Sequence, residues 1–66
     1  MNETKFKIKL LEMNCSVKDI AEALEISSQA VYKKLNGETN ITVDDLRRIK
    51  AKLNLTDEEV SEIFLL

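Results

Sequence analysis

Apolar residues recur three or four positions apart along most of this 66-residue chain, which is the spacing of a buried helix face. The pattern predicts five helices, which cover residues 2–14, two shorter stretches within residues 17–36, residues 43–53 and residues 57–65. The chain has no proline, and its single glycine, Gly37, follows a predicted helix, which favours helices over hairpins. We therefore expect an all-α fold, a compact five-helix bundle, in one domain over residues 1–66.

The first and fourth predicted helices each carry an apolar stripe that can enter a common core. The expected core positions there are Phe6, Leu10 and Met13, widened by Ile8 and Leu11, together with Val43, Leu46, Ile49 and Leu53.

Four helix starts share one local pattern, in which an apolar residue, a hydroxyl residue and a second apolar residue stand in fixed order. The hydroxyl can cap the helix while the two apolar side chains pack as a hydrophobic staple. The pattern occurs at Cys15-Ser16 with Ile20, Ile26-Ser27 with Val31, Ile41-Thr42 with Leu46, and Leu55-Thr56 with Val60. Asp19 takes the third helical position, and Asp45 and Glu59 complete two capping boxes.

The stretch from Val17 to Asn36 predicts two short helices joined by a tight turn. One apolar stripe is formed by Ile20, Ala21 and Leu24, a single Ile26 can plug the core beneath the turn, and Ala30, Val31 and Leu35 give the second helix a narrow buried face. The residues left outward on the second helix are polar and include no acid: Ser28, Gln29, Tyr32, Lys33 and Asn36. Such amide, hydroxyl and ammonium groups can bond base edges and phosphates.

This stretch resembles the helix-turn-helix of the Cro/phage-repressor (XRE-type) DNA-binding family. The matching positions are Ile20-Ala21, Ile26-Ser27, Gln29, Val31 and Asn36-Gly37, and a looser likeness extends over nearly the whole chain, including residues 41–64. The chain departs from the family at Glu25, where relatives usually have glycine, and at Lys34-Leu35, where many place the apolar residue one position earlier. The resemblance implies a λ-repressor-like fold with the helix-turn-helix at its second and third helices.

The resemblance further implies a sequence-specific transcriptional regulator that binds double-stranded DNA as a homodimer. It would act as a phage or mobile-element repressor on a palindrome, in the bacterial cytoplasm at the nucleoid. The expected base contacts are Ser28, Gln29 and Lys33. Gln29 comes first because its amide can bond adenine at two atoms. The expected backbone contacts are Ser16, Lys18, Ser27, Tyr32, Lys34, Asn36 and Asn40.

The net charge of −2 argues against DNA at first sight, but its distribution changes that view. Residues 1–53 carry ten basic and eight acidic side chains, whereas residues 54–66 carry four acids and no base. A local basic face is therefore compatible with the acidic total. Lys5 and Lys9 could contact phosphates, and Arg47 and Arg48 could contact the DNA backbone or a partner. For both pairs we favour a solvated face or, for the arginines, pairing with Asp44 and Asp45.

The last predicted helix combines an acidic start with an apolar end. We expect Ile63, Phe64, Leu65 and Leu66 to form a dimer interface, because not all of them can enter the core. Packing of this end on its own domain is the alternative. A second functional hypothesis is a protein-interaction module, such as an antitoxin, antirepressor or adaptor, that uses this helix.

The sequence offers no residues for catalysis or cofactor binding. It has no histidine, no glycine-rich phosphate loop and one cysteine, Cys15, which we expect to be a small core residue. We therefore expect no enzyme activity, no cofactor, no metal and no small-molecule substrate. No apolar run of about 18 residues is present, so we expect no membrane association.

Overall fold

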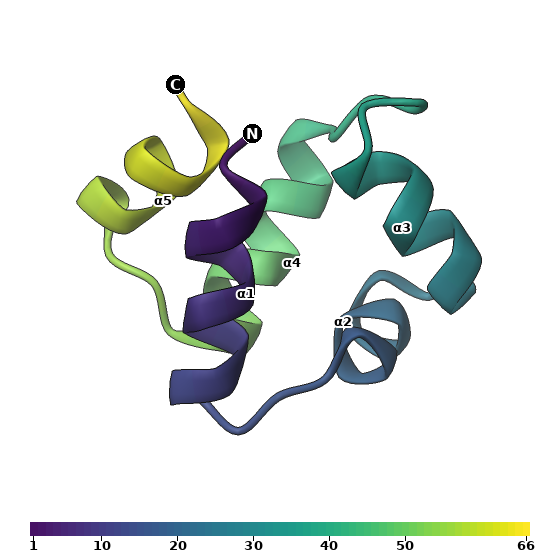
Figure 1. Ribbon diagram of the computed structural model, residues 1–66, viewed down its shortest axis with the longest axis horizontal. Helices are drawn as coiled ribbons and strands as arrows, with labels where there is room; N and C mark the ends of the chain where they lie inside the picture. The colour runs from purple at the N-terminus through teal and green to yellow at the C-terminus, as the bar shows by residue number, and fades with distance from the viewer.

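All five predicted helices are present in the computed structural model, which describes residues 1–66 and contains no strand. The helices are α1 (Glu3–Glu12), α2 (Val17–Leu24), α3 (Ser28–Leu35), α4 (Val43–Leu53) and α5 (Asp57–Phe64). In Figure 1, α1 stands between α5 on one side and the α2–α3 pair on the other, and α2 packs on both α3 and α4. The all-α, five-helix prediction is therefore confirmed.

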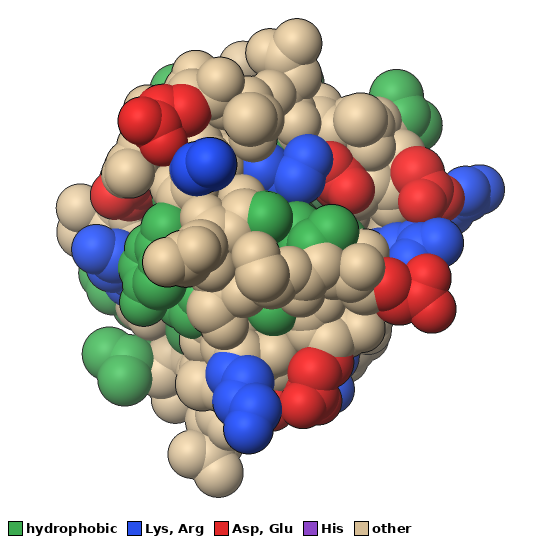
Figure 2. Space-filling model, turned by 90° about the vertical axis from the view of Figure 1, so that its right-hand side faces the viewer, with side chains coloured by type: hydrophobic (Ala, Val, Ile, Leu, Met, Phe, Trp, Pro, Cys, Tyr) green, Lys and Arg blue, Asp and Glu red, His purple; other side chains and the backbone are tan.

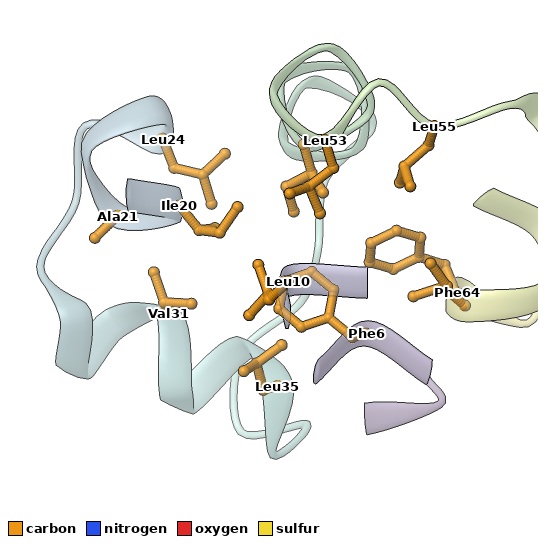
Figure 3. Close-up of a cluster of buried hydrophobic side chains, with 12 residues drawn as sticks. Phe6, Leu10, Ile20, Ala21, Leu24, Val31, Leu35, Leu53, Leu55 and Phe64 are labelled. Atoms are coloured by element: carbon orange, nitrogen blue, oxygen red, sulfur yellow. The ribbon is translucent and has the colours of Figure 1, made fainter. Parts of the chain in front are cut away.

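The core is built from twelve buried side chains, all of them apolar: Phe6, Leu10, Ile20, Ala21, Leu24, Val31, Leu35, Ile49, Leu53, Leu55, Ile63 and Phe64. Figure 3 shows Phe6 and Leu10 at its centre, with side chains of α2 and α3 on one side and Phe64 on the other. The rings of Phe6 and Phe64 meet edge to face, with centroids 6.3 Å apart. This contact joins α1 to α5 and is a favoured geometry for aromatic pairs.

Every helix begins with a side-chain cap and ends in a left-handed or glycine turn. Ser16, Thr42 and Thr56 form capping boxes with Asp19, Asp45 and Glu59, whereas Ser27 and Asn2 cap α3 and α1 without one. The boxes predicted at Thr42 and Thr56 are therefore confirmed, and the box at Ser16 is complete as well.

The helix ends repeat one hydrogen-bonding pattern. After α2, the Ile26 amide donates to the Ala21 carbonyl at 3.0 Å, and the same six-residue closure joins Cys15 to Leu10 and Leu55 to Lys50. Cys15, Ile26 and Leu55 are also the apolar residues that precede the caps of the following helices. One residue thus ends one helix and starts the next, which fixes the angle between them.

Several predicted core positions are wrong. Val43 is 82% exposed and Leu11 is 81% exposed, while Ile8 and Met13 are also exposed. At 100° per residue, Val43 lies about 90° from the centre of the stripe formed by the rest of its helix, so its side chain leaves the core. Ile8 and Leu11 lie on the face of α1 opposite Phe6.

Candidate nucleic-acid interface

The turn between α2 and α3 holds the two helices at a fixed angle. Glu25 ends α2 in the left-handed conformation, with φ 59° and ψ 40°, at the position where relatives usually have glycine. Ile26 packs against the core, and the Ser27 hydroxyl accepts a hydrogen bond from the Ala30 amide at 3.1 Å. Glu25 thus adopts the left-handed conformation at this turn although it is not a glycine.

The outer face of α3 is opposite its buried face. Val31 and Leu35 are buried, whereas Gln29 and Lys33, one turn apart, are exposed. At 100° per residue both lie within about 20° of the direction opposite Val31. The exposed residues also include Tyr32, while Ser28 is half-buried at the edge of this face. The residues expected to read bases thus lie on one helix.

Helix α3 alone has no acidic residue in its first turn, whereas the other four helices each carry at least one. Since the amino end of a helix carries partial positive charge, an acid there would repel a phosphate or a base acceptor. Figure 2 views the side of the molecule that α3 forms. Uncharged groups fill the centre of the view, and basic and acidic side chains lie side by side around them.

The side chains expected to contact the DNA backbone differ in exposure and in whether they already form hydrogen bonds within the protein. Ser27, Asn36, Asn40 and Lys18 are exposed. Ser16 is exposed too, but its hydroxyl donates to the Asp19 carboxylate at 3.2 Å, which places an acid at the start of α2. Backbone and side-chain hydrogen bonds from Ser16 hold the pKa of Asp19 below its ordinary value.

Lys34 is turned inward, unlike its neighbour Lys33. Its ammonium lies 2.8 Å from Asp45 Oδ2 and 2.9 Å from the Asn40 carbonyl oxygen, and its side chain is 18% exposed. Burial opposes charge on Asp45, but hydrogen bonds from Lys34 and the Thr42 amide keep its pKa below the ordinary value. Lys34 therefore serves the fold in the structure of the free protein.

The other basic side chains for which the sequence left two interpretations form ion pairs with acidic side chains. Lys9 Nζ lies 2.7 Å from Glu59 Oε2, and Lys5 Nζ lies 3.6 Å from Glu62 Oε2.

On α4, Arg48 Nε lies 3.0 Å from Asp44 Oδ2, and Arg47 pairs with the same carboxylate. Arg48 also approaches the turn residue Glu25 at 3.5 Å. Pairing of the arginines, one of the two interpretations of the sequence, is thus present with Asp44, while Asp45 pairs with Lys34 instead.

The residues expected at a dimer interface separate into two groups. Ile63 and Phe64 are buried in the core of the same chain, which accounts for them without a partner. Leu65 and Leu66 are 67% and 76% exposed. Only these two remain available to a second copy.

No helix exceeds 11 residues, and none has the length and hydropathy to traverse a bilayer. No cluster of three potential metal ligands occurs. Cys15 is half-buried and packs against the core.

Comparison with protein families shows which family this chain matches. The family described as "Helix-turn-helix" matches residues 6–60, which includes all of α2, α3 and α4. The chain belongs to the XRE-type helix-turn-helix family. This is a family of DNA-binding regulators, so the α2–α3 unit is a DNA-binding helix-turn-helix. No curated protein and no solved structure shows significant similarity to the chain.

Sequence reasoning overlooked one feature near this helix-turn-helix. The Lys34–Asp45 pair was not expected, because eleven residues separate the partners and the loop between them determines whether they meet. The predicted capping box between Thr42 and Asp45 was the only feature of the sequence that indicated where the Asp45 side chain would point, which is towards the last turn of α3.

Proposed function

We propose that this helix-turn-helix domain is a sequence-specific transcriptional repressor that reads its operator through α3. The observation that supports this most strongly is the exposed face of α3, where Gln29 and Lys33 lie opposite Val31 beside an amino end free of acid. A rigid helix with an outward amide can enter the major groove and discriminate bases. Gln29 would bond adenine at two atoms, and Ser28 and Lys33 would contact neighbouring bases.

The backbone contacts would come from the rim of the same surface. Ser27, Tyr32, Asn36 and Asn40 are proposed to bind phosphates on either side of the groove, and Lys18 to add a charged contact from α2. Ser16 would have to exchange the Asp19 carboxylate for a phosphate, because its amide and its hydroxyl both donate to that carboxylate.

We also propose that two copies bind a palindrome. In Figure 1, α5 and α3 lie at opposite sides of the molecule, so two copies that met through α5 would carry their α3 helices outward. Successive major grooves on one face of DNA are about 34 Å apart. The exposed Leu65 and Leu66 would supply the apolar contact, and a phage or mobile-element setting follows the family resemblance alone.

The experiment that tests the proposal is selection of binding sites from random DNA, followed by comparison with Gln29→Ala. We expect a palindromic consensus for the unmodified protein, and loss of preference at one base pair per half-site for the variant, at a cost of about 1–3 kcal/mol. Equal losses on operator and random DNA would refute the base-reading role of Gln29. Failure to enrich any sequence would refute the proposed function as a whole.

A further inference from the structure

The segment between α3 and α4 has few hydrogen bonds, and of its residues Ile41 packs against the core. Its first residues close the end of α3: the Gly37 amide donates to the Lys34 carbonyl, and the Glu38 amide donates to the Lys33 carbonyl at 2.9 Å. Gly37 has φ 82°, which favours glycine there. Beyond this turn, no backbone–backbone hydrogen bond involves Asn40 or Ile41.

The side chain of Lys34 supplies the missing connection. Its ammonium bonds the Asn40 carbonyl at 2.9 Å and the Asp45 carboxylate at 2.8 Å. The same Asp45 oxygen accepts a hydrogen bond from the Thr42 amide at 3.0 Å. A single cation thus joins the last turn of α3, the middle of the loop and the first turn of α4.

This cation is also shielded from solvent. The side chains of Lys34 and Asp45 are only 18% and 15% exposed, whereas those of Arg47 and Asp44, on the neighbouring surface, are 77% and 48% exposed. Ion pairs at exposed sites contribute little to structure, but a shielded pair with further hydrogen bonds constrains its surroundings more strongly. Lys34 is therefore poorly placed to leave Asp45 for a phosphate.

We propose that Lys34 is a positioning residue for DNA binding: paired with Asp45, it holds the Gly37–Ile41 loop at the angle at which Asn36 and Asn40 meet the DNA backbone. The proposal rests on the proposed function, since it assumes that this loop contacts phosphates. It assigns to Lys34 an indirect role, in place of the direct phosphate contact that the family resemblance implied.

The two roles predict opposite effects for Asp45→Asn. The amide keeps an oxygen for the Thr42 cap but loses its charge. If Lys34 only positions the loop, Asp45→Asn and Lys34→Met should both weaken binding to operator and random DNA by about 3- to 10-fold, because the loop must be ordered on binding. If Lys34 contacts a phosphate, Asp45→Asn should free its ammonium and strengthen binding instead.

Salt dependence provides the second readout. A lysine that neutralises a phosphate contributes about 0.9 to the slope of log affinity against log salt. We expect Lys34→Met to leave this slope unchanged, and the control variant Lys18→Met, at the exposed lysine proposed to contact a phosphate, to reduce it by about 1. A reduced slope for Lys34→Met, or tighter binding by Asp45→Asn, would overturn the positioning role.

Amide hydrogen exchange of the free protein separates this proposal from the proposed function. We expect Lys34→Met and Asp45→Asn to speed exchange at the Glu38 and Thr39 amides, which donate to the Lys33 carbonyl, while the amides of α1 keep their protection. Unchanged exchange at these two amides would refute the positioning role whether or not the protein binds DNA. If exchange rises but the unmodified protein binds no DNA, the loop contact stands and the proposed function fails.

Discussion

Lys9 on α1 and Glu59 on α5 meet with 2.7 Å between Nζ and Oε2, although fifty residues separate them along the chain. The other Glu59 oxygen accepts a hydrogen bond from the Thr56 amide at 2.9 Å, so one carboxylate both caps α5 and ties it to α1. Together with the contact between Phe6 and Phe64, this pair attaches the last helix to the rest of the fold.

The pair should make stability depend on pH. The hydrogen bond from Lys9, followed by that from the Thr56 amide, holds the pKa of Glu59 below its ordinary value of 4.5. Its stabilising contribution is therefore complete above about pH 4.5 and is lost as the pH falls through the lower pKa of the folded state. The bond to Glu59 raises the pKa of Lys9, so that contribution persists to alkaline pH.

We expect Glu59→Gln to flatten the fall in unfolding free energy between pH 7 and pH 3, measured by urea denaturation at each pH. The amide oxygen can still cap Thr56, which isolates the effect of charge. Glu58→Gln is the matched control, because Glu58 is exposed and forms no ion pair. An acid profile equal to that of the unmodified protein would contradict the assigned role of Glu59.

The structure also predicts a contrast between two apolar residues of α4. Ile49 is 4% exposed and lies in the core, whereas Val43 is 82% exposed. Ile49→Ala should cost about 2–5 kcal/mol of unfolding free energy, and Val43→Ala less than about 0.5 kcal/mol. Chemical denaturation of both variants checks this, and a large loss for Val43→Ala in the monomer would contradict the exposure of its side chain.

Replacing the turn residue Glu25 by glycine should stabilise the protein. Its φ of 59° costs a non-glycine residue about 1 kcal/mol, and its 3.5 Å approach to Arg48 is too exposed to offset that cost. Glu25→Gly should raise the unfolding free energy by about 1 kcal/mol. Glu22→Gly, in the middle of α2, should lower it by a similar amount, so the two variants differ in sign.

Tyr32 should contribute to DNA affinity without contributing to sequence preference. Its side chain is 49% exposed, and its hydroxyl has no partner within the protein. Tyr32→Phe should weaken binding to operator and random DNA alike, by about 3- to 10-fold, because one hydrogen bond to a phosphate is lost. Titration of both DNA types by fluorescence anisotropy measures this, and a loss on operator alone would indicate a base contact.

Sequence alone was sufficient where the determining interactions are local. The starts of α2, α4 and α5 were predictable because a cap and its box partner lie three residues apart, as with Thr42 and Asp45. The helix-turn-helix and its family were recognisable for the same reason, since the matching residues lie within one continuous stretch.

The exact buried positions and the long-range ion pairs depended on how the helices pack against one another, which the sequence does not reveal. Periodicity could not separate Val43 from Ile49, because the width of the buried stripe is set by the neighbouring helices. The direction of Lys34 could not be predicted either, since it depends on the path of the loop that brings Asn40 and Asp45 together. The bonding of Lys9 to Glu59 joins opposite ends of the sequence.

The shared residues at Cys15, Ile26 and Leu55 have a consequence for insertions. Each of them closes one helix with its amide and packs at the start of the next. One added amino acid there would place these two functions on different residues, and the angle between the adjacent helices would no longer be fixed. The segment 37–41 has no such double function and could lengthen with less harm. Changes in chain length should therefore preserve the fold better in segment 37–41 than at these three junctions, although they would move Asn40 from the position in which Lys34 holds it.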